Sequence, residues 1–215
     1  MTDAPITTIY DHGPEAPESM VILLHGLGSN GQDLISLAPL WAKELPNTLF
    51  LSPDAPFACD MVPPGYPNSY QWFSLQDRDP HVMLQGVEAA APILDDFITQ
   101  QLENYSLSAD KLALCGFSQG TMMSLYVGPR YKDKIAGVLG YSGAMIGEGG
   151  EHKIPVHLVH GEADDVVPVE AYHHAKETLE KNGHAVSGHT TAYLQHSINQ
   201  DGLDSGGNFL KSILK

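Results

Sequence analysis

The sequence predicts an α/β fold, in which helices cover both faces of a mainly parallel sheet. Short β-rich runs alternate with longer helical patterns along the chain, which is typical of such a sheet. Several of these runs are continuously apolar rather than alternating, as expected for strands that are buried on both faces. The chain of 215 residues has no internal repeat and no composition shift, so we expect one domain over residues 1–215.

The expected strands are the short β-rich runs, namely Met20–Leu24, Leu49–Ser52, Lys111–Cys115, Ile135–Gly140, Pro155–His160 and Ala185–Leu194. The expected helices are the longer patterns between and after them, namely Gly31–Leu45, Val82–Tyr105, Gln119–Tyr131, Val169–Asn182 and Ser205–Leu214. In parallel sheets the connecting helices follow the strands in turn, and this order agrees with that arrangement.

The segment from Pro53 to Pro80 breaks this rhythm, because it carries six prolines and no clear element. Loops this long inside a domain usually serve as lids or binding walls. Trp72, Phe73 and Met61 would supply the apolar lining that is typical of ligand pockets. We therefore expect the segment to wall a substrate pocket with these three side chains. The alternative is a loop that packs its aromatic residues on the domain surface.

Charge and composition exclude several classes of function. The formal net charge is −15, from 11 basic and 26 acidic residues. Such a chain repels phosphate backbones and anionic membranes, so we expect no nucleic-acid partner. The N-terminus MTDAPITTIYDHG lacks a basic region followed by an apolar stretch, and no apolar run approaches the roughly 20 residues that span a bilayer. We expect a cytoplasmic protein without stable membrane insertion, and the oligomeric state stays open, a homodimer included.

The strongest functional signal is Gly116-Phe-Ser-Gln-Gly120, which follows a β-rich run and precedes a helical pattern. A G-x-S-x-G motif in this context predicts a nucleophile elbow, a tight strand-to-helix turn that presents a serine at the carboxyl edge of an α/β-hydrolase sheet. Ser118 is therefore the expected nucleophile, with a helix N-terminus beneath it that favours developing negative charge. A chance motif in a chain with 21 glycines is the alternative, and the flanking strand and helix disfavour it.

A carboxylate and a histidine should follow the nucleophile in that order. Asp164 and Asp165 follow the apolar run Pro155–His160, and the G-x-x-D spacing from Gly161 favours Asp164 as the acid. Asp165 would then bond the backbone of the turn, as Asx residues do. Of the 11 histidines, His196 alone follows the last expected strand, so it is the expected base.

An oxyanion hole requires the N–H after the nucleophile and a second N–H from an early loop. The first donor would be Gln119, and Leu27 in the turn Leu23-Leu-His-Gly-Leu-Gly-Ser-Asn-Gly31 is the best candidate for the second. His25 is expected to brace this turn rather than take part in the chemistry. A phosphate-binding interpretation is disfavoured, because the turn lacks both G-x-G-x-x-G and the Walker lysine.

Together these motifs resemble the carboxylesterase/phospholipase family of α/β-hydrolases, which includes small bacterial carboxylesterases and acyl-protein thioesterases. The resemblance spans nearly the whole chain and rests on Leu24-His-Gly-Leu-Gly28, Gly116-Phe-Ser-Gln-Gly120, His160-Gly-Glu-Ala-Asp-Asp-Val-Val-Pro168 and His196-Ser. It implies Ser118 as nucleophile, Asp164 as acid and His196 as base, with Leu27 and Gln119 as the oxyanion hole. Trp72-Phe73 looks similar to the pocket wall of bacterial members. Thr121 and Tyr193-Leu-Gln depart from the family pattern, so the substrate range of relatives does not transfer directly.

These observations predict a serine carboxylesterase that acts on small-molecule esters with short to medium acyl chains and uses no metal or organic cofactor. Lysophospholipase or acyl-protein thioesterase activity with the same triad is the nearest alternative. A non-catalytic binding protein of the same fold has no need of a complete Ser–Asp–His set. A cysteine-nucleophile hydrolase, as in dienelactone hydrolases, is disfavoured because the elbow carries Ser118.

Overall fold

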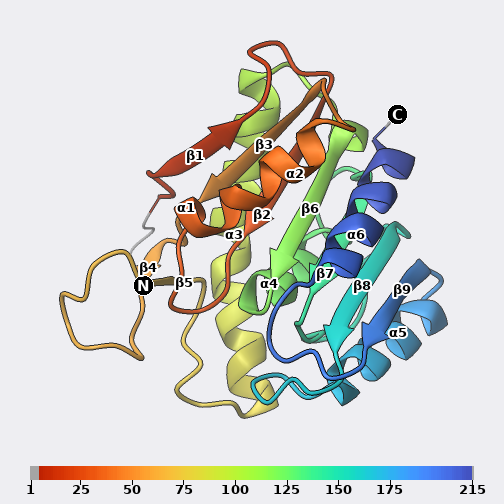
Figure 1. Cartoon of the computed structure of the whole chain (residues 1–215). Helices are drawn as coiled ribbons and strands as arrows, with labels where there is room; N and C mark the ends of the chain where they lie inside the picture. The colour runs from red at the N-terminus through yellow and green to blue at the C-terminus, as the bar shows by residue number, and fades with distance from the viewer. Residues whose placement is uncertain (1–4, 215) are drawn as a thin grey trace.

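The computed structural model describes residues 5–214 and contains one seven-stranded sheet and one two-stranded sheet. The strands of the larger sheet are β1 (Ile9–His12), β2 (Ser19–Leu24), β3 (Thr48–Pro53), β6 (Leu112–Phe117), β7 (Gly137–Tyr141), β8 (Pro155–Gly161) and β9 (Ala185–Thr191). Their order is β1-β3-β2-β6-β7-β8-β9 (Figure 1). Only the edge strand β1 is antiparallel to its neighbour. We expect no secretory signal in the N-terminal segment MTDAPITTIYDHG, and residues 1–4 of this segment lie outside the described residues.

The helices are α1 (Gly31–Leu34), α2 (Ala38–Ala42), α3 (Pro80–Asn104), α4 (Gln119–Val127), α5 (Glu170–Lys181) and α6 (Gln200–Ile213). Short 3-10 turns, Ile35–Leu37 and Ala109–Lys111, precede α2 and β6. In Figure 1, α1, α2 and α6 cover one face of the sheet, whereas α3, α4 and α5 cover the other. The fold class expected from the sequence is therefore confirmed. No helix within residues 5–214 is both long enough and apolar enough to cross a bilayer.

Alternate residues of the central strands serve the two helical layers. Ile22 and Leu114 pack with α3 and α4 in the larger apolar cluster. Val21 and Cys115, one residue away on the same strands, pack with α2 and α6 in the other cluster. Because successive side chains of a strand point to opposite faces, a continuously apolar strand can serve both layers.

Every expected strand and helix is present, but several boundaries differ. The expected helix Gly31–Leu45 is divided into α1, a 3-10 turn and α2, with Pro39 in the first turn of α2. Proline has no N–H to continue the hydrogen bonding of a preceding helix. The last helix begins at Gln200 rather than Ser205, because Asn199 caps it by accepting a hydrogen bond from the Gly202 N–H. The sequence did not indicate that first turn as helical, because glycine is a poor helix former and the helix contains several glycines.

Three short strands were missed. β1 is a half-exposed edge strand without an apolar run, so its sequence gives no burial signal. β4 (Phe57–Ala58) and β5 (Tyr70–Gln71) form the two-stranded sheet inside the segment Pro53–Pro80. That segment is therefore a small hairpin-like unit with a loop between its strands, rather than a loop throughout.

Candidate active site

Ser118 occupies the turn between β6 and α4, with φ 53° and ψ −114°. Such a backbone conformation costs on the order of 1–3 kcal/mol, so the surroundings must enforce it. A Cβ on Gly120 would lie 1.7 Å from the Leu24 carbonyl oxygen, and a Cβ on Gly116 would lie 2.3 Å from the Gly120 carbonyl carbon. Only glycine fits either position, so the two glycines allow the sharp turn that presents Ser118.

Asp164 lies just beyond the end of β8, and its carboxylate is almost fully hydrogen-bonded. Oδ2 lies 2.7 Å from Nδ1 of His196. Oδ1 accepts hydrogen bonds from the N–H groups of Val166 and Val167, at 2.9 and 2.8 Å. Burial alone would raise the pKa of Asp164, but the bonds from His196, Val167 and Val166 outweigh it and hold the pKa below its ordinary value. The group is therefore a carboxylate at neutral pH.

Asp165, the neighbour, is exposed. We expected Asp165 to bond the turn backbone, and this expectation is wrong. Asp164 makes those backbone hydrogen bonds through Oδ1 while Oδ2 faces His196. One carboxylate has two oxygens, so a single aspartate both fixes the turn and holds the imidazole.

His160 also reaches this carboxylate, which the sequence analysis missed. Its Nε2 lies 2.8 Å from the Val167 carbonyl oxygen and 3.4 Å from Oδ2 of Asp164. A carbonyl oxygen only accepts, so Nε2 carries the proton and donates it. His160 was not a candidate base, because it precedes the last expected strand in the sequence. It is the penultimate residue of β8, however, and it lies four residues before Asp164.

His196 lies in the loop between β9 and α6, beside the elbow. Its ring centroid is 4.9 Å from that of Phe117, the residue before the nucleophile. Its hydrogen bonds within residues 5–214 involve Nδ1 only, and its ring lines the same cavity as Ser118. Nε2 has no hydrogen-bond partner within the described residues, the Ser118 hydroxyl included. Catalytic hydrogen bonds are often long in a free enzyme and tighten when substrate binds.

The turn before α1 brings a second backbone donor to the elbow. Leu27 and Gln119 supply N–H groups that donate to no backbone carbonyl within the described residues. Gln119 is the first residue of α4, where N–H groups have no partner inside the helix. Leu27 and Ser118 line the same cavity. The structure thus brings together both predicted oxyanion donors and the predicted nucleophile.

His25 braces this turn, as expected. Nε2 accepts a hydrogen bond from the Ala55 N–H at 2.9 Å, which leaves Nδ1 to donate to the Gly26 carbonyl at 2.7 Å. Burial lowers the pKa of His25, which keeps the ring neutral and able to do both. The ring ties the turn to the chain that follows β3.

Trp72 and Phe73 also belong to this bracing rather than to the cavity wall. Trp72 is 1% exposed, and its indole N–H donates to the His25 carbonyl at 3.0 Å. The Gln119 side chain accepts from the Trp72 N–H at 2.9 Å and donates to the Phe73 carbonyl at 2.8 Å. A buried indole N–H needs an acceptor, and here the acceptor is the His25 carbonyl in the turn that carries Leu27.

The cavity beside Ser118 has a volume of about 390 Å³. Its apolar wall includes Leu34, Leu75, Met83, Met122, Val167 and Ala171. Trp72, Phe73 and Met61 do not line it, so the structure does not place the three predicted substrate contacts there. Met61 is 53% exposed on the loop between β4 and β5. The segment Pro53–Pro80 contributes Leu75 and Arg78 to the wall instead.

Within the described residues, no group of three or more His, Cys, Asp or Glu side chains could hold a metal ion. The buried cysteines Cys59 and Cys115 form no disulfide. Burial raises the pKa of the Cys115 thiol, which makes it a packing residue.

Comparisons with known proteins find similar esterases and thioesterases. A family model described as phospholipase/carboxylesterase matches residues 10–214. The crystal structure of esterase PE8 is similar with a TM-score of 0.88 and 36% identity, over 96% of this chain and 98% of that chain. Acyl-protein thioesterase 2 from Zea mays is similar with a TM-score of 0.77 and 25% identity, over 97% and 99% of the two chains.

Relatives found by sequence carry related names. Acyl-protein thioesterase 1 from Debaryomyces hansenii is 26% identical over 215 residues, which cover 92% of each chain. Esterase YpfH from Escherichia coli is 26% identical over 196 residues, which cover 88% of this chain and 82% of that protein. The similarity therefore extends over nearly all of the chain that carries the elbow, the acid loop and His196.

Proposed function

The chain belongs to the phospholipase/carboxylesterase family of serine hydrolases, and we propose that it cleaves carboxylic esters with Ser118, His196 and Asp164 as its catalytic triad. The observation that carries this proposal is the bond from His196 Nδ1 to Asp164 at the cavity that His196 shares with Ser118. The bond fixes the imidazole tautomer in which Nε2 can accept a proton.

The proposed reaction has two steps. Ser118 Oγ attacks the ester carbonyl carbon while its proton passes to His196 Nε2, and the tetrahedral oxyanion is bound by the N–H groups of Leu27 and Gln119. The bond to the leaving oxygen then breaks, and His196 returns the proton to the departing alcohol. In the second step water attacks the acyl carbon while His196 takes one of its protons. The bond from that carbon to Ser118 Oγ then breaks, His196 returns the proton to Oγ, and the acid is released. Asp164 stabilises the imidazolium in both steps.

Labelling with a fluorophosphonate probe tests this proposal against a non-catalytic binding protein of the same fold. The probe reacts with activated serines, so we expect it to label the wild type and not Ser118→Ala. Ser212→Ala removes an exposed hydroxyl on α6 and should label like the wild type. Absence of labelling in the folded wild type would contradict the proposal.

We expect kcat/KM to fall as the pH is lowered, because a protonated His196 cannot accept the Ser118 proton. Asp164 does not cause this fall, since its pKa is held below the ordinary carboxylate value and it stays ionised throughout the range in which histidine titrates. The measurement is kcat/KM between about pH 5 and 8. A profile that is flat there, with single-turnover data showing that chemistry limits the rate, would argue against His196.

We propose a preference for short to medium acyl chains, because the cavity of about 390 Å³ is small and mostly apolar. Each buried methylene should raise kcat/KM about four-fold, from about 0.8 kcal/mol, until the cavity is full. Met83→Ala should therefore move the optimum toward longer chains, because it removes a side chain from the wall. A series of p-nitrophenyl esters measures this.

Met61→Ala is the matched control, because it makes the same change at an exposed site outside the wall. Its chain-length profile should equal that of the wild type. If Met61→Ala moved the optimum and Met83→Ala did not, the acyl chain would lie against the loop between β4 and β5 instead.

Thioester cleavage by the same triad is the second candidate, because relatives named acyl-protein thioesterase match over most of the chain. An oxygen ester and its sulfur analogue with one acyl group distinguish the two. The thioester has the better leaving group, which by itself favours its cleavage to some degree. If kcat/KM for the thioester exceeded kcat/KM for the oxygen ester by more than this intrinsic difference, the chain would be identified as a thioesterase. We further propose that the protein is cytoplasmic. We also propose that it has no nucleic-acid partner, because its net charge of −15 repels phosphate backbones.

A further inference from the structure

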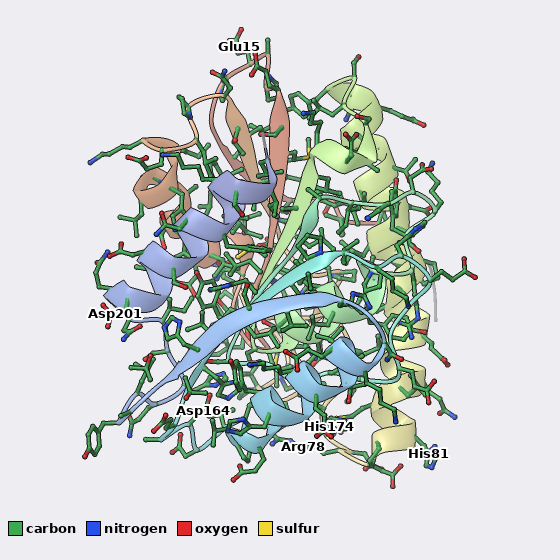
Figure 2. The ribbon with its side chains drawn as sticks, turned by 90° about the vertical axis from the view of Figure 1, so that its right-hand side faces the viewer. Glu15, Arg78, His81, Asp164, His174 and Asp201 are labelled. Atoms are coloured by element: carbon green, nitrogen blue, oxygen red, sulfur yellow. The ribbon has the colours of Figure 1, made fainter. Side chains whose placement is uncertain are left out.

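Arg78 is the feature of the cavity that ester hydrolysis does not explain. It lies between β5 and α3, and its side chain lines the same cavity as Ser118 and His196. No other lysine or arginine among the described residues lines this cavity. Figure 2 shows Arg78 at the same end of the molecule as Asp164, with Glu15 at the opposite end. Arg78 is solvent-exposed, and most of the other residues that line the cavity, such as Leu75 and Met83, are apolar.

No carboxylate of the described residues lies within 4.0 Å of the Arg78 guanidinium. The two adjacent acids bond to backbone instead, because Asp77 accepts from the Asp79 N–H and Asp79 caps α3 by accepting from the His81 N–H, each at 2.9 Å. The five donors of Arg78 are therefore free for a ligand.

Arg130, the other arginine in the chain, shows the contrasting case. It donates to the Tyr126 carbonyl at 3.0 Å and to the Glu148 carbonyl, and its guanidinium lies 4.1 Å from the centroid of the Tyr126 ring. Structure alone accounts for Arg130. Arg78 has no such hydrogen bond or ring contact within the described residues.

We propose that Arg78 binds a carboxylate carried by the substrate, so that the preferred esters have a negatively charged group on the acyl or the alcohol part. This inference rests on the proposed hydrolysis at Ser118. A guanidinium matches a carboxylate with two parallel N–H donors. The net charge of −15 repels anions, so a local cation at the cavity is what an anionic substrate needs. Asp33 on α1 is the one carboxyl side chain among the described residues that line the cavity, and it accepts a hydrogen bond from the Ser29 hydroxyl.

Two substrate pairs test the inference and locate the charge. Mono-4-nitrophenyl adipate carries a carboxylate on the acyl part, and 4-nitrophenyl hexanoate is its neutral counterpart. 4-(Butanoyloxy)benzoate carries a carboxylate on the alcohol part, and phenyl butanoate is its counterpart. In each pair the measured quantity is kcat/KM for the anionic ester divided by that for the neutral ester, at low and high salt.

We expect Arg78→Gln to lower this ratio about five-fold in one of the pairs, mainly through KM, since Arg78 is exposed and an exposed charge pair contributes up to about 1 kcal/mol. Arg78→Glu should lower it further, and high salt should shrink the effect. Lys43→Gln removes an equal charge from an exposed lysine outside the cavity and should leave both ratios unchanged.

Unchanged ratios in both pairs with Arg78→Gln and Arg78→Glu would overturn the inference while leaving ester hydrolysis intact. An equal fall with Lys43→Gln would overturn it too, because the effect would then be one of net charge. If the folded wild type neither cleaves any of the four esters nor labels with the fluorophosphonate probe, the proposed function itself fails.

Discussion

Replacing Ser118 with alanine is expected to lower kcat at least about 10⁴-fold, because triad members act as a unit and the loss of the nucleophile leaves only binding and the oxyanion donors. The fold should survive this change. The turn geometry at Ser118 depends on Gly116 and Gly120, which remain, and the Ser118 side chain accepts no capping hydrogen bond from the N–H groups of α4. Steady-state kinetics on a p-nitrophenyl ester measure the loss, and thermal unfolding monitors the fold.

Ser142→Ala is the matched control for this substitution. Ser142 follows β7 beside the elbow, is buried, and also has a positive φ, of 46°. Its hydroxyl has no hydrogen-bond partner among the described residues and does not line the cavity. Ser142→Ala removes the same atom, also at a residue with a positive φ, but outside the cavity. It should therefore keep kcat within a few-fold of wild type. If Ser118→Ala retained a tenth of the activity, the nucleophile would lie elsewhere.

The elbow and the order of the strands and helices could be predicted, because both depend on residues that are neighbours in the sequence. A strand, a G-x-S-x-G turn and a helix follow each other in adjacent residues, and strands buried on both faces are apolar throughout. His196 could be predicted by its place after β9, although that strand ends three residues earlier than expected, at Thr191. These features depend on chain order rather than on contacts across the fold.

The residues of the cavity wall could not be predicted. They come from segments that are far apart in the sequence, and they depend on the direction in which each side chain points. Trp72 has the composition of a pocket residue, but its indole N–H is satisfied by the carbonyl of His25, 47 residues away. Leu75, Met83 and Met122 reach the cavity from three different segments, and none carries a local signal of function. His160 was missed for a similar reason. Its contact with Asp164 depends on the fold of the turn after β8, which the bond from the Val167 N–H to Asp164 stabilises.

Asp164→Asn is expected to lower kcat about 10⁴-fold, the loss known for the corresponding change in chymotrypsin-type enzymes. The structure supplies the reason. The Val166 and Val167 N–H groups require an acceptor, so the oxygen of the new amide stays toward them and its NH₂ group turns to His196. Nδ1 must then accept, which places the ring proton on Nε2, and Nε2 can no longer take the Ser118 proton.

Asp165→Asn is the control, because Asp165 is exposed and the same chemical change there should alter kcat less than about two-fold. Asp164→Asn should also change how stability depends on pH. The pKa of Asp164 is depressed in the folded state, so its ionised form stabilises the fold above the unfolded-state pKa of about 3.9, and this contribution disappears as the pH falls through the folded-state pKa. The difference in unfolding free energy between wild type and Asp164→Asn should therefore narrow below about pH 4. Equal losses of activity in the two variants would mean that the bond from His196 to Asp164 does not control the tautomer on which the proposed mechanism depends.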